Sequence, residues 1–281
     1  MIFTTMKTNL RTITAFVCVL MALLPGCAIA KEKPVSVAVP AGIRHEAWDA
    51  LLKIYVNEKG LVAYEKWKAN AADRKSLDDY LAQFAPAGTA AKGDELAASA
   101  INAYNAFAIR WILENYPTES IQSLDKSFAR KAHPIGGQKV ALEDLEHGTL
   151  RPLIGWRMHA VLVCCARSCP PLQRTAYTGE GLGRQIDAAY RSWLAREDLN
   201  RFSPEKNSAG ISSIFKWFKV DFEKAGGVPK ILGMYGPEAQ RAFLAKGGYK
   251  IDYLAYRWGL NDQGGRGENY SRANLIFDTL F

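Results

Sequence analysis

Metal-ligand spacings are missing from this sequence, which has only four histidines and five cysteines among its 281 residues. It contains neither an HExxH pattern nor a pair of CxxC patterns, the spacings typical of zinc sites. It also lacks internal repeats and basic stretches interleaved with aromatic residues. We therefore expect no metal, no cofactor and no nucleic-acid partner.

Acidic residues are outnumbered, with 28 Asp and Glu against 36 Lys and Arg, so the formal net charge is +8. An exported protein of this charge can meet anionic polymers of the cell envelope, although the same charge can serve solubility alone. The hydrophobic content of 48% is that of a globular chain with a substantial core.

Long apolar runs are also absent, apart from an uncharged stretch at 13–24 that two basic residues precede. This run is too short to span a bilayer, and Ala28 and Ala30 give the small-residue pattern that signal peptidase prefers. We predict a signal peptide over 1–30 and export to the periplasm or the exterior. Alternatively, the sequence LPGC ending at Cys27 is a lipidation signal, and we expect membrane contact only in that case.

The hydrophobic pattern predicts more helices than strands. We expect helices over 44–58, 76–84, 95–116, 142–150, 178–195 and 211–224, and strands over 60–64, 158–163 and 249–258 with a hairpin at 135–140. The regular strand–helix alternation of a doubly wound sheet is missing. We predict an α+β fold, predominantly helical around a small mixed or antiparallel sheet. Residues 31–43 would be an extended lead-in, 44–262 a single domain, and 263–281 a tail that is either a docked helix or a disordered end.

The stretch HAVLVCCARSCPPL, residues 159–172, places three cysteines within six residues. An odd number of thiols in an oxidising compartment leaves at least one free or paired between chains. Cys164 and Cys169 can form a disulfide if their Cα atoms lie within about 7 Å, with Cys165 as a small buried side chain. Alternatively, one thiol is a nucleophile whose pKa is lowered by Arg167 or by a helix N-terminus. The sequence leaves both alternatives open.

A nucleophilic thiol requires a histidine as base and a polar group that orients it. His147 lies on the helix predicted just before the cysteine strand, so it is the favoured partner of Cys164. His159 would face Cys165 on a regular strand and is a weaker candidate.

Asn102 and Asn105 lie three residues apart on a helix that is apolar nearly all round. Buried amides destabilise a fold unless their hydrogen bonds are satisfied, so we expect both side chains to be buried and hydrogen-bonded. They either fix the packing or, alternatively, orient a histidine or stabilise an oxyanion.

Several of these segments together resemble the domain of unknown function 547 family. Five motifs of the family occur here in the same order. They are W-I-N-A-Y-N-A at 101–106, D-x-E-H at 142–147, H-F-A-L-N-C-A-S-x-S-C-P-P at 159–170, L-S-x-I-F-K-W-Y at 211–218 and Y-L-x-Y-D-W-x-L-N at 253–261. The resemblance covers about 96–261 and implies candidate positions rather than a reaction, because the family's activity is not established.

The sequence departs from the family pattern at Val163, where the family has asparagine, and at Arg257, where it has aspartate. Cys165 stands where the family has a small residue. The family's first cysteine persists where the second does not, which favours Cys164 over Cys169 for a shared role and argues against an obligatory disulfide.

We predict an exported, thiol-dependent hydrolase or transferase acting on amide or ester bonds, papain-like in layout, with its catalytic cleft near Cys164, His147 and Asn102. The substrate would be a small molecule or an envelope polymer. The alternative is a non-catalytic envelope-binding or scaffold domain in which the cysteines close a structural loop. Supporting candidates for the site are Asn105, Glu146, His159, Arg167, Ser168 and Cys169.

Overall fold

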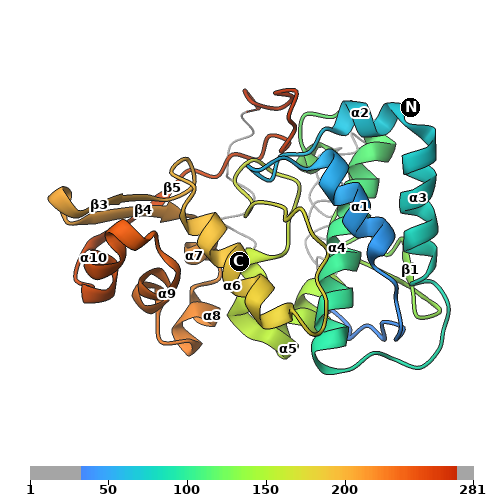
Figure 1. The fold of residues 1–281 in the computed structure, drawn as a ribbon, viewed down its shortest axis with the longest axis horizontal. Helices are drawn as coiled ribbons and strands as arrows, with labels where there is room; N and C mark the ends of the chain where they lie inside the picture. Colours follow the sequence, from blue (N-terminus) through green and yellow to red (C-terminus); the bar gives the residue numbers. More distant parts are fainter. Residues whose placement is uncertain (1–32, 271–281) are drawn as a thin grey trace, which may run out of the picture. The chain divides into compact units, whose positions relative to one another are not determined.

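The computed structural model of the chain describes residues 33–270 (Figure 1). The predicted signal peptide, the lipidation alternative at Cys27 and residues 271–281 of the predicted tail lie outside the described residues. From Pro34 onward the described residues belong to one compact unit. The described residues of the lead-in, 33–43, contain no helix, and Pro40 makes an isolated bridge to Ala90.

Four helices form the first part of the fold: α1 (Glu46–Tyr55), α2 (Tyr64–Ala69), α3 (Ala71–Ala82) and α4 (Gly93–Asn115). The predicted helix at 44–58 is confirmed by α1. The predicted strand at 60–64 is wrong, because Val62 makes only isolated bridges and Tyr64 already begins α2. Helix α3 begins earlier than predicted, because the side chain of Asn70 accepts the N–H of Asp73 and caps it there.

Helix α4 is buried along most of its length, as its apolar sequence predicts. Helices α2 and α3 pack against it, and Figure 1 shows this arrangement. The helix ends at Asn115, two residues before Pro117, because proline lacks the N–H that would continue the hydrogen-bonded ladder. Its central position allows its polar side chains to hold the segments that follow.

The predicted hairpin is confirmed by the antiparallel strands β1 (His133–Ile135) and β2 (Gln138–Val140). Its turn contains Gly136 and Gly137, whose φ angles of 59° and 79° favour glycine. A Cβ atom on Gly136 would also lie 2.2 Å from the backbone oxygen of Ala38, so this turn requires glycine for space as well.

A chain of short helical segments follows the hairpin: the π-helix η2 (Asp144–Leu150), α5 (Arg151–Ile154) and the 3₁₀ helix η3 (Gly155–Ala160). The predicted helix at 142–150 is confirmed. The predicted strand at 158–163 is wrong, since the backbone N–H groups of Val161 and Leu162 both donate to the carbonyl oxygen of Met158. The strand-based argument that placed His159 on the face of Cys165 therefore does not apply.

The last part of the fold contains the remaining helices and a three-stranded sheet. The helices are α6 (Leu182–Leu194), α7 (Ile214–Trp217), α8 (Lys219–Lys224), α9 (Val228–Tyr235) and α10 (Arg241–Lys246). The strands are β3 (Arg201–Ser203), β4 (Ser208–Ser212) and β5 (Lys250–Leu254). Single-turn 3₁₀ helices are η1 (Ile121–Ser123), η4 (Pro204–Lys206) and η5 (Glu238–Gln240).

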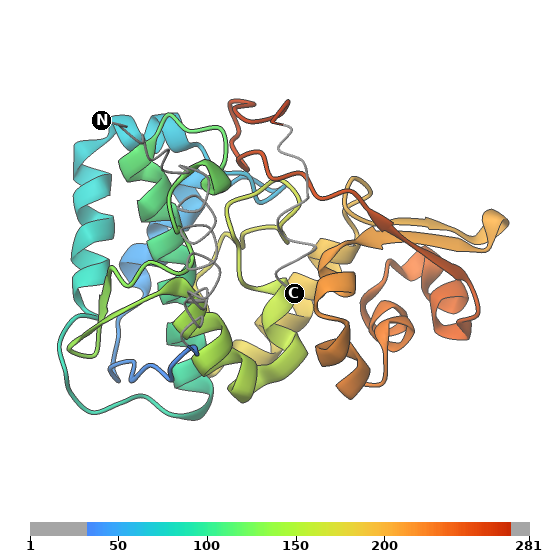
Figure 2. The ribbon, with the colours of Figure 1, turned by 180° about the vertical axis from the view of Figure 1, so that it is seen from behind.

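Strand β4 pairs antiparallel with β3 and parallel with β5, so this sheet is mixed. Figures 1 and 2 show α9 and α10 together on one side of the sheet. The predicted helix at 211–224 is wrong at its start, where β4 continues to Ser212, and the rest divides into α7 and α8. The fold is α+β and mostly helical, with two small sheets of which one is mixed.

Candidate functional site

Cys164 and Cys169 are joined by a disulfide bond, with their Cα atoms 6.2 Å apart. Of the cysteines in the described residues, only Cys165 is unbonded. It is fully buried, and burial raises the pKa of its thiol to about 12. The structure therefore contains the bonded alternative of the two that the sequence left open, with Cys165 as a small buried side chain.

The disulfide closes the cysteine loop, residues 164–169, which pairs with the C-terminal segment, residues 256–262. The backbone N–H of Arg167 donates to the carbonyl oxygen of Gly259 over 2.8 Å. The Ser168 hydroxyl accepts the backbone N–H of Arg257, and the backbone N–H of Ser168 donates to the Arg257 carbonyl oxygen. The backbone of the loop therefore pairs with residues that lie some 90 positions later in the sequence.

Tyr256 packs directly against the disulfide. Its hydroxyl oxygen lies 3.2 Å from the sulfur atoms of both Cys164 and Cys169. Burial, supported by the nearby charge of Glu146, raises the pKa of this phenol, so its hydroxyl stays protonated and can donate to sulfur. The rings of Trp217 and Tyr256 lie 4.8 Å apart between centroids, so a second aromatic side chain packs against Tyr256.

Asn102 and Asn105 are buried and hydrogen-bonded, as predicted. Asn105 donates to the carbonyl oxygen of Val161 and accepts the N–H of Val163, each over 2.9 Å. Asn102 makes the same two-way contact with the backbone of Tyr177, over 2.8 and 3.0 Å. In this structure both amides hold backbone segments, and Asn105 fixes the residues that lead into Cys164.

Glu146 and His147 lie on the π-helix η2, a type of helix that is often found at functional sites. Their side chains are 18% and 19% exposed, and His147 Nε2 lies 3.8 Å from Glu146 Oε1. Tyr104 donates its hydroxyl proton to Glu146 Oε2 over 3.2 Å. The charge of Glu146 also adds to the effect of burial in raising the pKa of Tyr256, whose hydroxyl contacts both sulfur atoms of the disulfide.

His159 belongs to a different, buried network. Its Nε2 lies 2.9 Å from Asp221 Oδ2, and Arg151 Nε lies 2.9 Å from the same oxygen. The imidazole stacks on Phe218 with centroids 4.1 Å apart. Burial lowers the pKa of His159, against the opposing effect of Asp221. His159 is thus a core histidine whose polar atom is satisfied by a carboxylate.

The charge of Asp221 holds this network together. Burial acts to raise its pKa, but the hydrogen bonds and positive charges of His159 and Arg151 outweigh burial and lower the pKa to about 2. Sequence reasoning missed Asp221, Arg151 and Tyr256. Tyr256 falls inside a motif of the family resemblance, and that was the only signal that could have identified it.

Within residues 33–270, no three His, Cys, Asp or Glu side chains gather into a group that could hold a metal ion. In the same part of the chain, no helix is both long and apolar enough to cross a membrane.

Residues 89–194 match the sequence model of a family described as "Protein of unknown function, DUF547". The matched stretch includes both buried asparagines, the π-helix and the cysteine loop, whereas Asp221 and Tyr256 lie beyond it. No curated protein and no solved structure matches the chain.

Proposed function

We propose that this chain, which carries a DUF547 domain over residues 89–194, is an exported, non-catalytic domain that binds a component of the cell envelope. The observation that carries the proposal is the bond between Cys164 and Cys169. A sulfur atom in a disulfide is not a thiolate and cannot attack a carbonyl group as one. The third cysteine, Cys165, is buried with a raised pKa and is unsuited to the same role.

The contacts of the cysteine loop support a structural role for it. Its backbone pairs with the C-terminal segment, and Tyr256 of that segment contacts both sulfur atoms. Closing the loop therefore fixes where the C-terminal segment crosses the domain. A rigid crossing of this kind is suited to presenting side chains at a constant position on the surface.

The disulfide also supports the proposed export. Disulfides persist in oxidising compartments such as the periplasm and the exterior, and they are rare where thiols are kept reduced. The pattern of the first thirty residues predicts the same route. We propose release after Ala30, with anchoring through Cys27 as the alternative.

A thiol count tests the structural role. Mature protein beginning at Lys31 should show one reactive thiol after denaturation without reductant, from Cys165, and three after reduction. Three thiols in the denatured, unreduced protein from the secretory route would contradict it. N-terminal sequencing of that protein, with cell fractionation, tests export, since a diacylated Cys27 would move it to a membrane.

Co-sedimentation tests the envelope-binding part of the proposal. Full-length mature protein is mixed with purified cell envelopes and centrifuged, with an unrelated protein of similar positive charge as the control. Retention beyond that of the control supports binding, whereas equal retention contradicts it.

A second candidate is the thiol-dependent hydrolase or transferase, papain-like in layout and active only after reduction. It is favoured by the partly buried position of Cys164 next to the Tyr256 hydroxyl. The charge of Glu146 acts on the pKa of Tyr256, and His147 lies 3.8 Å from Glu146. A dithiol reductant would supply two electrons and two protons, breaking the disulfide into two thiols while the reductant becomes a disulfide.

Reduced protein and p-nitrophenyl acetate separate the two candidates. A burst of p-nitrophenol that is lost in Cys164→Ser, retained in Cys169→Ser and slowed in His147→Ala would establish the second candidate and overturn the first. No burst above that of Cys164→Ser would eliminate the second candidate.

A further inference from the structure

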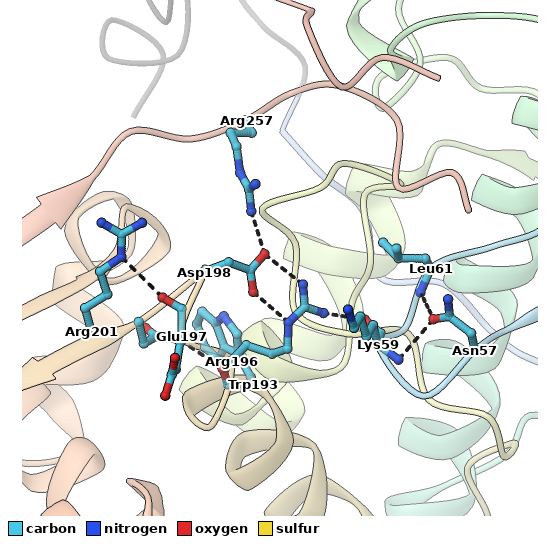
Figure 3. Close-up of polar contacts among 10 residues, drawn as sticks. Asn57, Lys59, Leu61, Trp193, Arg196, Glu197, Asp198, Arg201 and Arg257 are labelled. Carbon is cyan, nitrogen blue, oxygen red and sulfur yellow. Dashed lines mark hydrogen bonds and ion pairs between the residues drawn. The ribbon is translucent and has the colours of Figure 1, made fainter. Parts of the chain in front are cut away.

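Charged side chains gather around Asp198 (Figure 3). One of them is Arg257, whose backbone N–H donates to Ser168 of the cysteine loop. Arg196 contacts both carboxylate oxygens of Asp198, with Nε 2.7 Å from Oδ1 and NH2 2.8 Å from Oδ2. Arg257 NH2 lies 2.7 Å from the same Oδ2 atom. We call Arg196, Arg201 and Arg257, arranged around Asp198, the arginine cluster.

Positive charge is in excess here. Asp198 is a single carboxylate shared by two guanidinium groups. Arg201 directs its Nε to a neutral acceptor, the backbone oxygen of Glu197, over 3.3 Å. In Figure 3 the carboxylate of Glu197 points away from the Arg201 guanidinium. The cluster therefore carries guanidinium charge that its own carboxylate does not neutralise.

The ionised state of Asp198 is stable. Partial burial acts to raise its pKa, but the hydrogen bonds and charges of Arg196 and Arg257 outweigh burial and lower the pKa to about 2. The carboxylate therefore stays charged at every pH at which a cell envelope functions, and it keeps the two guanidinium groups oriented.

Three separate segments hold the cluster in place. Arg257 is fixed through its backbone to Ser168 of the cysteine loop. Arg196 follows the end of α6 and donates a hydrogen bond to the backbone oxygen of Lys59. The turn around Lys59 is itself fixed by the side chain of Asn57, which accepts two backbone N–H groups over 3.0 Å each. Preorganised cations lose little conformational entropy when a ligand binds.

The cluster is accessible to a large ligand, since the side chains of Arg257 and Arg196 are 46% and 21% exposed. A guanidinium group has five N–H donors in a planar fork that matches the oxygen atoms of a phosphate or a carboxylate. Arg257 contacts Asp198 through NH2, one nitrogen of its guanidinium group. Each fork can bind one oxyanion, so neighbouring forks suit oxyanions that repeat along a polymer.

We propose that the arginine cluster binds oxyanion groups, phosphate or carboxylate, that repeat along an anionic polymer of the cell envelope. This inference rests on the proposed envelope-binding function and names the surface and the chemistry that would carry it. Asp198 is a positioning residue in this scheme, and the disulfide supports the cluster indirectly by holding the loop against which Arg257 is fixed.

The test uses mature, disulfide-bonded protein and two fluorescently labelled probes, long-chain polyphosphate and poly-L-glutamate. The variant Arg196→Gln/Arg257→Gln is compared with Lys75→Gln/Lys219→Gln, which removes the same charge from two exposed i,i+4 ion pairs elsewhere. We expect fluorescence anisotropy to show binding that is weakened about tenfold or more by the arginine changes and about twofold or less by the control.

Two kinds of outcome overturn the inference. Equal weakening by both double variants would mean that overall charge, rather than this cluster, is responsible. Phosphatidylglycerol vesicles serve as a third probe, by co-sedimentation. Absence of binding to both polymers, with or without binding to the vesicles, would reject an anionic polymer as the ligand. Preference for one probe assigns the source of the oxyanion as phosphate or carboxylate, and either preference supports the inference.

Two further measurements distinguish a failure of oxyanion binding by the arginine cluster from a loss of folding and from a failure of the proposed envelope-binding function. The variant Arg257→Lys retains the positive charge but lacks the planar guanidinium fork. Weaker polymer binding than wild type at an unchanged melting temperature supports recognition by the fork, whereas unchanged binding contradicts it. If wild type and Arg196→Gln/Arg257→Gln are retained equally by cell envelopes, the inference fails while the proposed function stands. If wild type is not retained at all, the proposed function itself fails.

Discussion

Ser168 and Arg257 are joined in both directions: the N–H of Arg257 donates to the Ser168 hydroxyl over 2.9 Å, and the N–H of Ser168 donates to the Arg257 carbonyl oxygen over 3.3 Å. Ser168 belongs to the loop that the disulfide closes, whereas the side chain of Arg257 extends to Asp198 on the surface. The disulfide and the arginine cluster are therefore linked through Ser168 and Arg257, and removal of the disulfide should change the position of the Arg257 side chain.

Replacing both bonded cysteines, Cys164→Ser with Cys169→Ser, should lower the free energy of unfolding by about 2 kcal/mol, because the short loop is no longer closed in the unfolded chain. Urea unfolding measures the loss. The same variant should bind the polymer probes less tightly than wild type, since Arg257 loses its fixed neighbour. Reductant should destabilise wild type and leave the variant unchanged; equal effects on both would show that the bond contributes nothing.

Asn105→Ala should lower the free energy of unfolding by about 1–3 kcal/mol, because the buried backbone groups of Val161 and Val163 lose their partners. Thermal or urea unfolding of the oxidised protein gives the value. Asn115→Ala, at the end of the same helix, is the matched control and should cost less, because its side chain makes one contact that is only partly buried. Similar losses in both variants would contradict a special role for Asn105.

Stability should fall as the pH is lowered from 7 to 5, and His133 should account for part of the fall. Burial, together with the charges of Arg130 and Arg110, lowers the pKa of His133 to about 4 in the folded protein. The unfolded chain binds a proton near pH 6.5 while the folded protein does not, so acidification favours unfolding. We expect roughly 1–2 kcal/mol from this residue over that range.

His133→Gln provides the comparison for this pH dependence. Urea midpoints of wild type and variant, measured at pH 7 and pH 5, should show a smaller decrease in the variant. Burial also lowers the pKa values of His45 and His159, so the variant should retain part of the dependence. An identical decrease in both proteins would show that His133 titrates normally in the folded state.

Asp221→Asn should destabilise the protein by about 2–4 kcal/mol at pH 7, because His159 and Arg151 lose the charge that both contact. The folded pKa of Asp221, about 2, lies below the unfolded value near 3.9. Its contribution is therefore fully present above about pH 4 and is lost as the pH falls towards 2. The difference between wild type and variant should shrink over that interval, whereas exposed Asp252→Asn should show little difference at any pH.

Local sequence signals predicted several elements correctly. The spacing of Trp48, Leu51, Leu52 and Tyr55 defines the buried face of α1, and Gly136 with Gly137 marks the hairpin turn. Helix propensity, apolar periodicity and turn chemistry act between residues that are near each other in the chain, so they can be read without knowing the fold.

The apolar run before Cys164 shows where such signals fail. Residues 158–163 have strand-like composition, but their backbone groups bond to Met158 and to the side chain of Asn105, more than fifty positions earlier, rather than to a neighbouring strand. A short apolar run is compatible with a strand or with a buried turn, and the available hydrogen-bond partners decide between them.

By itself the sequence determined the helical, α+β character of the chain, the buried asparagines of α4, the family resemblance and the possibility of a bond across the cysteine loop. Only the tertiary structure decided that Cys164 is bonded to Cys169, that Asp221 satisfies His159, and that Asp198 lies between Arg196 and Arg257. These pairings depend on which distant segments the folded core brings together. Charge and hydrogen-bonding capacity are properties of each residue, but a partner is a property of the whole fold.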